Sequence, residues 1–316
     1  MYGIDVSNYV SSFNTAFYFV VVISLIFLVA LTFLMLYFIF RYNRKKNSVA
    51  TQIEGNLPLE IVWTVVPIIL AMAMFHFGWA GWKPTRNAPD NSMEVTSIAR
   101  MWSFTFTYDN GKKSADLVVP VNTPVKINLV SLDVIHSLFI PAFRIKSDMV
   151  PGIEKMMWFL PKMEGEYDLY CAEYCGLRHS YMNALVKVLS KEEFEKWYTD
   201  SLNIVQTDET EAVGSAGSAG NEIIRTQGCN ACHSSDGSKL VGPSFLNLYG
   251  HTVTVVKDGK DVTVTADDEY IKRSITDPNV EIVKGYQPGL MQSYKDVLSE
   301  EEIVAIIEYL KTLNEK

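Results

Sequence analysis

Two long apolar runs near the N-terminus constrain this chain of 316 residues more than any other feature. Residues 15–40 carry no charged side chain, and residues 61–82 have His76 as their one titratable group, which we interpret as structural. At a rise of about 1.5 Å per residue, an apolar helix of about 20 residues crosses a hydrocarbon core of roughly 30 Å. We therefore expect two transmembrane helices, at about 15–40 and 61–82, that form a hairpin in membrane lipid.

Basic residues around these runs predict the orientation of the hairpin. Arg41, Arg44, Lys45 and Lys46 follow the first run, and no Lys or Arg precedes it. A cleaved signal peptide is the competing interpretation, but it needs a basic segment before a shorter apolar core. Because short loops rich in Lys and Arg stay in the cytoplasm, we place the N-terminus and everything after Lys83 on the periplasmic or outer side of a bacterial cytoplasmic (inner) membrane.

Net charge and cysteine spacing limit the classes of function that the chain can have. The formal net charge is −8, which argues against binding to nucleic acid. The four cysteines form two close pairs, Cys171 with Cys175 and Cys229 with Cys232. An even number of cysteines in an exported protein is consistent with disulfides, whereas close spacing beside a histidine is typical of metal and haem sites.

Residues 91–204 have the pattern of a β-sandwich or barrel. Short runs rich in Val, Phe and Thr are separated by turn signals such as Asp109-Asn110-Gly111, as expected for closely spaced strands. The expected strands are 93–98, 102–108, 117–119, 125–130 and 156–160. A capping box that begins at Ser190 predicts a short closing helix.

The segment 171–182 concentrates soft and borderline metal ligands. Cys171, Cys175, His179 and Met182 offer two thiolates, an imidazole and a thioether, a set that suits copper. A mononuclear blue-copper site has one Cys, so the second thiolate allows two bridged copper ions, with His136 as a further imidazole. A Cys171–Cys175 disulfide and a zinc site are the alternatives, although Met is a poor zinc ligand.

A second outer domain follows residues 205–220, which we interpret as a flexible linker because residues 214–220 contain only Gly, Ser and Ala. Within residues 221–316, Cys229, Cys232 and His233 form the Cys-x-x-Cys-His signature of c-type haem attachment. A thioredoxin-like redox pair is the rival interpretation, but its βαβ setting is absent from the pattern. Met291 is the only methionine after this motif and is the predicted sixth ligand of the haem iron.

Two further patterns describe the second outer domain. A capping box beginning at Ser299 predicts a final helix. Residues 252–256 and 262–265, on either side of Asp258-Gly259, predict an inserted β-hairpin.

Together these motifs resemble subunit II of haem-copper cytochrome c oxidases. Asp-Val-x-His-Ser at 133–137, Pro-Gly at 151–152 and the ligand motif at 171–182 resemble its binuclear copper (CuA) domain, and residues 221–316 resemble a class I cytochrome c, a fusion similar to caa3-type oxidases. The implied fold class is a multidomain membrane protein. It has a two-helix transmembrane hairpin (1–90), a cupredoxin-like β-sandwich or barrel (91–204), the linker and an all-α class I cytochrome c domain.

The resemblance also implies roles for individual residues. Cys171 and Cys175 bridge both copper ions. His179 and the backbone carbonyl of Glu173 complete one ion, and His136 and Met182 complete the other. The Glu173 side chain points towards a possible magnesium ion at the subunit I interface.

Two residues outside the ligand motifs receive roles from the same resemblance. Glu60, in the pattern Glu-x-x-Trp-Thr-x-x-Pro, lies at the mouth of a proton channel in that family; a carboxylate that stabilises the helix start is the alternative. Trp102 aligns with the leading tryptophan of the strand where cytochrome c delivers electrons, although Phe104 replaces the usual second tryptophan. A half-buried strand aromatic is the alternative for Trp102.

The implied function is electron transfer from haem c to CuA and on to haem a of subunit I, where a proton-pumping complex reduces oxygen to water. The implied partners are subunit I, other oxidase subunits, and a cytochrome c or a quinol-oxidising complex as the donor. The alternatives are the CuA subunit of a nitric-oxide reductase and a stand-alone membrane-anchored electron carrier.

Overall fold

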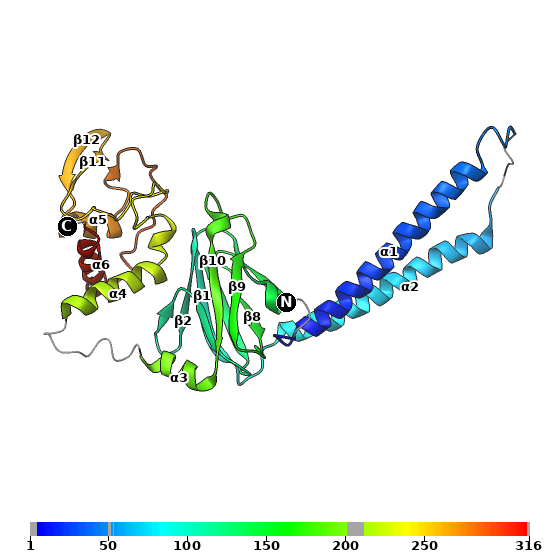
Figure 1. Cartoon of the computed structure of the whole chain (residues 1–316), viewed down its shortest axis with the longest axis horizontal. Coiled ribbons are helices and arrows are strands. Elements are labelled where there is room, and N and C mark those ends of the chain that lie inside the picture. Colours follow the sequence, from blue (N-terminus) through cyan, green and yellow to red (C-terminus); the bar gives the residue numbers. More distant parts are fainter. Residues whose placement is uncertain (1–4, 50–51, 53, 201–211, 315–316) are drawn as a thin grey trace.

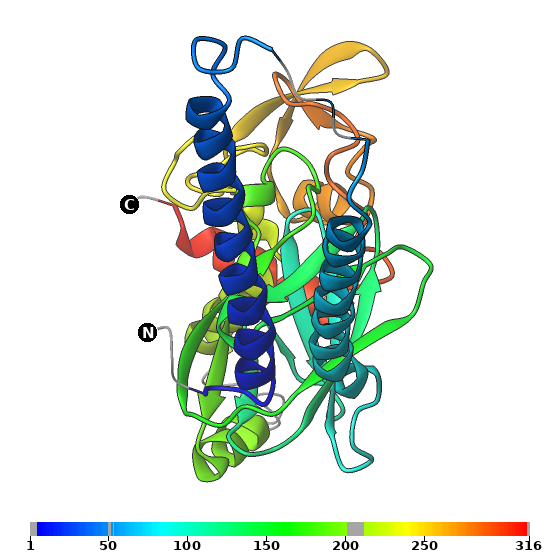
Figure 2. The ribbon, with the colours of Figure 1, turned by 90° about the vertical axis from the view of Figure 1, so that its right-hand side faces the viewer.

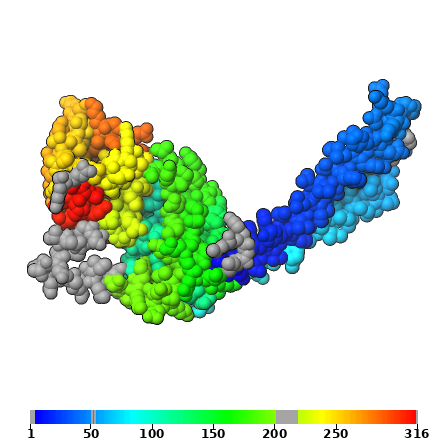
Figure 3. Space-filling model, in the orientation of Figure 1, coloured from blue at the N-terminus to red at the C-terminus, as the bar shows by residue number. Residues whose placement is uncertain are grey.

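We analysed a computed structural model of the chain, which describes residues 5–49, 52, 54–200 and 212–314. Figure 1 shows three parts in a row: a helical hairpin, a β-domain in the middle and a smaller, mainly helical domain. The space-filling view shows that the smaller domain lies directly against the β-domain, whereas the hairpin projects away from it (Figure 3).

The hairpin consists of α1 (Val10–Arg41) and α2 (Leu57–Trp82), which lie side by side (Figures 1 and 2). Both helices are long and apolar enough to cross a membrane, and the apolar window of neither is buried by the rest of the protein. Each begins a few residues before the predicted apolar run, at Val10 and at Leu57. At the start of α2 the side chain of Asn56 accepts a hydrogen bond from the backbone N–H of Leu59.

Both ends of the hairpin are attached to the β-domain. Ser7 forms an isolated β-bridge with Pro161 just before α1. The short 3-10 helix η1 (Lys83–Arg86) follows α2, and the carbonyl oxygen of Pro84 accepts a hydrogen bond from the indole of Trp158. The membrane helices and the β-domain are therefore joined at two places.

The β-domain consists of two five-stranded sheets whose buried faces form one hydrophobic core. The parallel pairs β1–β5 and β4–β10 connect distant segments of the chain. The first sheet has the order β3 (Lys113–Ser114), β2 (Ser103–Tyr108), β1 (Met93–Arg100), β5 (Val125–Ser131) and β8 (Lys155–Phe159). The second has the order β4 (Leu117–Pro120), β10 (Asn183–Leu189), β9 (Gly165–Cys171), β6 (His136–Ile140) and β7 (Ile145–Met149).

The five strands expected from the sequence are confirmed with small shifts at their ends, and β3, β6, β7, β9 and β10 add to them. In β9 the exposed Glu166 and Asp168 alternate with Tyr167 and Leu169, a period-2 pattern that we did not predict. Two single 3-10 turns, η2 (Pro141–Phe143) and η3 (His179–Tyr181), interrupt the second half of the domain. The expected closing helix is α3 (Lys191–Asp200), capped by Ser190.

The smaller domain surrounds a second hydrophobic core. Its first and last helices, α4 (Ala212–Thr226) and α6 (Glu300–Thr312), pack against each other, and the predicted capping box at Ser299 is present. Between them lie η5 (Cys229–Ala231), the expected hairpin β11 (Thr252–Lys257) and β12 (Lys260–Thr265), α5 (Asp268–Thr276) and β13 (Ile282–Val283). Strand β13 pairs with β11, so the hairpin is part of a three-stranded sheet.

Helix α4 overlaps the second half of the predicted linker, whose flexibility stays a prediction. Helix α4 begins at Ala212 and includes the Gly/Ser/Ala tract at 214–220; residues 205–211 lie outside the described residues. The physical reason is tertiary packing: a Cβ at Gly220 would lie 2.1 Å from the backbone oxygen of Ala305 in α6. Glycine at this position permits the close contact between the two helices, a property that composition alone does not reveal.

Candidate metal and haem sites

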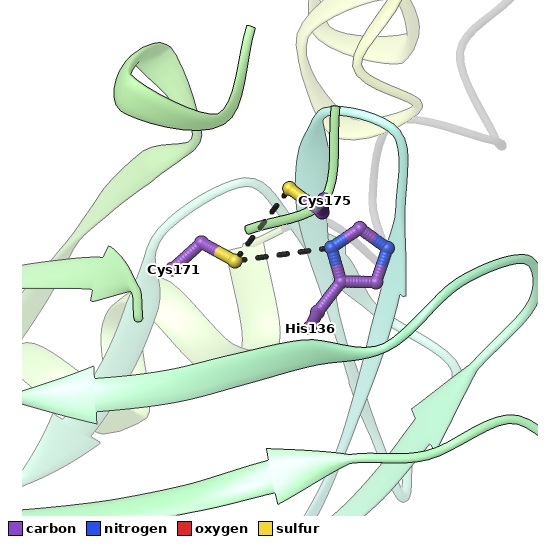
Figure 4. A group of neighbouring side chains, drawn as sticks. All are labelled: His136, Cys171 and Cys175. Carbon is purple, nitrogen blue, oxygen red and sulfur yellow. Dashed lines mark hydrogen bonds between the residues drawn. The ribbon is translucent and has the colours of Figure 1, made fainter. Parts of the chain in front are cut away.

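His136, Cys171 and Cys175 form a buried cluster of potential metal ligands at one end of the β-domain. Figure 4 shows the three side chains pointing towards one another, His136 from the start of β6, Cys171 from the end of β9 and Cys175 from the loop after it. The Sγ atoms of the two cysteines are 3.7 Å apart, and Nδ1 of His136 is 3.8 Å from Sγ of Cys171. Both cysteines are free thiols, so this structure does not contain the alternative disulfide.

The other predicted ligands adjoin the same two sulfur atoms. Nδ1 of His179 lies 3.5 Å and Sδ of Met182 lies 3.8 Å from Sγ of Cys175. The backbone oxygen of Glu173 lies 3.3 Å from Sγ of Cys171. Strand β9 and the residues up to η3 therefore bring the donor atoms of the motif close to the two sulfur atoms. His136 joins them from β6, a separate segment.

The electrostatics of the two thiols are coupled. Burial raises the pKa of Cys171, but hydrogen bonds with His136 and with backbone groups outweigh burial and lower it. Burial and the adjacent negative charge on Cys171 raise the pKa of Cys175. The protein alone therefore favours one thiolate and opposes a second, so a pair of thiolates needs additional positive charge nearby.

Asp133 is a site residue that the motif contained but whose role we did not predict. Its Oδ1 lies 2.8 Å from Nε2 of His136, and its Oδ2 accepts a hydrogen bond from the backbone N–H of Met101 at 2.7 Å. The contact at Nε2 leaves Nδ1 of His136 facing the sulfur atoms, the arrangement by which an outer carboxylate orients a metal-ligating histidine. The position of Asp133 three residues before His136 is the sequence feature that could have indicated this role.

A large cavity occupies the smaller domain, and Cys229, Cys232, His233 and Met291 all line it. Residues of α4, α5, β13 and α6 also line the cavity. The remaining lining is mainly apolar. The cavity therefore suits a large apolar group, and the two cysteines are free to bond it.

His233 is held in one orientation at this cavity. Its Nδ1 lies 2.7 Å from the carbonyl oxygen of Pro243, and its ring stacks on Phe245 at a centroid distance of 4.7 Å. A Cβ at Gly242 would approach the His233 ring to 2.6 Å, so a glycine is required there. Burial lowers the pKa of His233, which favours a neutral imidazole with Nε2 available as a ligand.

The turn between β1 and β2 lies between the two sites. Met101 lines the cavity of the smaller domain, and its neighbour Trp102 donates a hydrogen bond from Nε1 to the carbonyl oxygen of Cys175 at 3.1 Å. Trp102 is 4% exposed, more buried than the half-buried strand position considered for it. Sequence reasoning missed Met101, because no local signal connects it with a cavity formed more than a hundred residues later.

Glu60 and the Glu173 side chain have local partners in this structure. Oε1 of Glu60 accepts a hydrogen bond from the backbone N–H of Asn56 at the start of α2. Oε1 of Glu173 lies 2.7 Å from Nζ of Lys146. These contacts do not test a proton-channel role for Glu60 or a magnesium site at Glu173, and both stay predictions.

Comparison with known families assigns each part of the chain. Residues 7–78 match the transmembrane domain of cytochrome c oxidase subunit II, residues 112–189 match its periplasmic domain, and residues 217–314 match cytochrome c. The fold therefore defines a class of membrane proteins with a hairpin of two apolar helices, a cupredoxin-like outward-facing domain and a cytochrome c domain.

Two similar proteins match this chain over most of its length, and a solved domain matches part of it. Cytochrome c oxidase subunit 2 of Alkalihalophilus pseudofirmus is 30% identical over 90% of this chain and 83% of its own length. The corresponding subunit of Bacillus sp. (strain PS3) is 28% identical over 86% of this chain and 79% of its own length. The periplasmic domain of the Bradyrhizobium japonicum subunit has 27% identity over 37% of this chain and 98% of its own, with a TM-score of 0.35. The chain belongs to the cytochrome c oxidase subunit II family.

Proposed function

We propose that this chain passes electrons from a covalently bound haem c to a binuclear copper (CuA) centre and on to haem a of subunit I, where oxygen is reduced to water. The observation that carries the proposal is the position of one dipeptide. Met101 lines the cavity with the Cys-x-x-Cys-His motif, and Trp102 is hydrogen-bonded to the carbonyl group of Cys175 in the copper motif. The two candidate redox sites are thus joined by adjacent residues.

The residues at the copper motif fit the proposed metal. Two free thiols, two imidazoles, a thioether and a backbone carbonyl lie around one point, a donor set that suits copper better than zinc. Cys171 and Cys175 would hold the copper ions as thiolates in this proposal. His136, Glu173, His179 and Met182 supply the remaining ligands. When bound, the metal pair supplies one-electron chemistry, and the buried β-scaffold limits movement of the ligands.

The residues at the second cavity fit haem c. Cys229 and Cys232 would supply the two thiols, His233 is oriented by Pro243, and Met291, which lines the same cavity, would supply a thioether to the iron together with His233. The rival thioredoxin-like interpretation lacks support, because η5 follows α4 and no described strand precedes the cysteine pair in this domain.

The surface around the copper motif supports the proposal that a large protein partner binds there. Exposed apolar side chains gather on the loops around His136 and Cys175, as expected for an interface with subunit I and other oxidase subunits. These side chains are Leu132, Ile135, Tyr174, Leu177 and Tyr181. A magnesium ion at Glu173 on this interface and a proton-channel entrance at Glu60 belong to the same proposal, as does a bacterial inner-membrane location with both outer domains in the periplasm.

The proposed domain boundaries are residues 1–90, 91–204 and 221–316, with α4 overlapping the second half of the predicted linker. The nitric-oxide reductase and stand-alone carrier alternatives are not favoured, because relatives matched over most of the chain are named as cytochrome c oxidase subunits. The physiological donor in this proposal is a cytochrome c or a quinol-oxidising complex.

Stopped-flow reduction of the purified complex tests the proposed path. We expect haem c to be reduced first and copper to follow in a first-order step whose rate does not depend on protein concentration. A copper centre that is reduced by the donor before haem c, or at a rate set by dilution, contradicts the proposal. Absence of haem a and of a subunit I partner from the purified complex contradicts the assignment to an oxidase.

A further inference from the structure

Arg100 is a buried cation at the boundary between the two outer domains. It is the last residue of β1 in the β-domain and is 6% exposed. Its Nε has no hydrogen-bond partner, and no carboxylate within the described part of the chain forms an ion pair with it. A buried charge without an ion-pair partner is costly unless other groups compensate it, so the groups that contact Arg100 matter.

The group that Arg100 does contact belongs to the other domain. The guanidinium carbon lies 5.1 Å from the ring centroid of Tyr294, a cation–π contact between the two domains. Tyr294 is 8% exposed, lines the haem cavity and lies three residues after Met291. Its hydroxyl donates a hydrogen bond to the carbonyl oxygen of Gln227, two residues before Cys229. Tyr294 therefore connects Arg100 with the segment that contains Met291 and with the segment just before Cys229.

Neighbouring contacts show that the two domains fit closely at this boundary. The hydroxyl of Thr105 in β2 donates a hydrogen bond to the carbonyl oxygen of Thr226 at 2.5 Å. A Cβ at Gly228 would lie 2.0 Å from Oγ of Ser103, so only glycine permits this approach. Figures 1 and 3 show the smaller domain against the β1–β2 side of the β-domain.

Arg100 also places a positive charge near the haem-attachment sequence. It contacts Tyr294, which lines the same cavity as Cys229, Cys232 and His233 and is hydrogen-bonded to the backbone of Gln227. The cavity thus faces a positive charge supplied by the copper-binding domain. A fixed positive charge beside a redox group disfavours its oxidised, more positive state.

We propose that Arg100 is a positioning residue that holds the haem domain on the copper domain through Tyr294 and raises the reduction potential of the haem in the docked arrangement. This inference rests on the proposed function, because it needs a haem at Cys229, Cys232 and His233. It adds that the fused domain occupies one fixed site on the copper domain. The potential of the haem therefore depends on docking.

The test uses the full chain in the assembled complex, with Arg100→Met, Arg100→Lys and Tyr294→Leu. The matched control is Lys260→Met, which removes one positive charge from the exposed hairpin of the haem domain. The first measurement is the midpoint potential of haem c by spectroelectrochemical titration at fixed pH and salt. The second is the first-order rate of haem-to-copper electron transfer. A low-spin haem spectrum and an intact copper spectrum serve as the folding controls.

We expect Arg100→Met to lower the haem potential by more than Lys260→Met does, and Arg100→Lys to stay closer to the parent. Loss of a desolvated cation–π contact should weaken docking and slow electron transfer about tenfold in Arg100→Met and in Tyr294→Leu. A parental potential and rate in a correctly folded Arg100→Met overturn the inference. If Arg100→Met does not assemble, an unchanged rate in Tyr294→Leu overturns it. A parent without covalent haem refutes the proposed function instead.

Discussion

The indole Nε1 of Trp102 donates a hydrogen bond to the backbone carbonyl oxygen of Cys175 at a distance of 3.1 Å. A Cβ at Gly176 would lie 3.3 Å from the Trp102 ring, so the residue after Cys175 also packs on this indole. Asp133 strengthens the same connection, because it bonds both the backbone of Met101 and the ring of His136. The candidate ligands Cys175 and His136 are therefore both coupled to the turn of Met101 and Trp102 that faces the haem domain.

Replacement of Trp102 by Phe tests this connection. Phe retains an aromatic ring but removes the donor to Cys175, so we expect the copper spectrum to remain and haem-to-copper transfer to become slower. Flash-induced or stopped-flow reduction of copper measures the rate. Trp197→Phe in α3 is the matched control, because Trp197 packs on Tyr108 at another place in the β-domain. Equal rates in the two variants would show that Trp102 is only a structural aromatic.

Cys175→Ser should abolish the mixed-valence copper spectrum and leave the haem c spectrum intact. The reason is that the two candidate sites have separate ligand sets, although Cys232 packs against the core that contains Cys171 and Cys175. The measurement is the visible and electron paramagnetic resonance spectrum of the purified complex. Cys232→Ser is the reciprocal control and should reduce covalent attachment of haem while copper remains. Loss of both spectra in Cys175→Ser would contradict the ligand assignment.

Met291→Ala should keep the haem covalently attached but convert it to a high-spin or ligand-binding form. His233 and both thiols remain in this variant, so only the second axial position changes. Optical spectra with and without carbon monoxide report the change. Met163→Ala, at an exposed methionine of the β-domain, is the control. A low-spin spectrum identical to that of the parent would exclude Met291 as the ligand.

The proximity of the copper-motif side chains could be predicted from the sequence because they lie close together along the chain. Cys171, Cys175, His179 and Met182 lie within one segment, and the structure places their donor atoms around one point. The contact of Arg100 with Tyr294 could not be predicted, since it joins residues almost two hundred positions apart whose types are common elsewhere.

Two features of the fold differ in this respect. The Gly/Ser/Ala tract at 214–220 has a weak intrinsic preference for helix, and Gly220, at its end, packs on α6, a segment distant in the sequence. Strand β9, in contrast, has a local signal that we did not use, because Glu166 and Asp168 alternate with Tyr167 and Leu169.

Glu60→Gln should slow oxygen consumption several-fold without slowing the transfer from haem c to copper. A carboxylate at a proton entrance affects steps coupled to proton uptake, and those lie beyond the copper site. The variant retains an oxygen acceptor for the backbone N–H of Asn56, so the start of α2 should lose only about 0.5 kcal/mol of helix-dipole stabilisation. Turnover and single-step transfer rates are compared with those of Glu54→Gln in the same loop. Unchanged turnover and proton uptake would leave Glu60 as a helix-start residue.

Glu281 makes the stability of the haem domain dependent on pH. Its side chain is 9% exposed, with Oε1 at 2.7 Å from Nζ of Lys257 and Oε2 at 3.3 Å from a guanidinium nitrogen of Arg273. The hydrogen bond with Lys257 lowers the pKa of Glu281, and Arg273 adds to this against the opposing effect of burial. The carboxylate thus joins β11, α5 and the start of β13.

Because the folded-state pKa is below the unfolded value of about 4.3, the stabilisation by Glu281 is fully present above that value and is lost as the pH falls through the folded-state pKa. We expect Glu281→Gln to lower the free energy of unfolding of the haem domain by about 1 kcal/mol at pH 7. The difference from the parent should shrink towards zero in acid. Denaturant unfolding, followed by loss of the low-spin haem spectrum between pH 7 and 3, measures it, with Glu269→Gln on the exposed side of α5 as the control. A difference that stays constant over this range would show that Glu281 acts through packing and not through its charge.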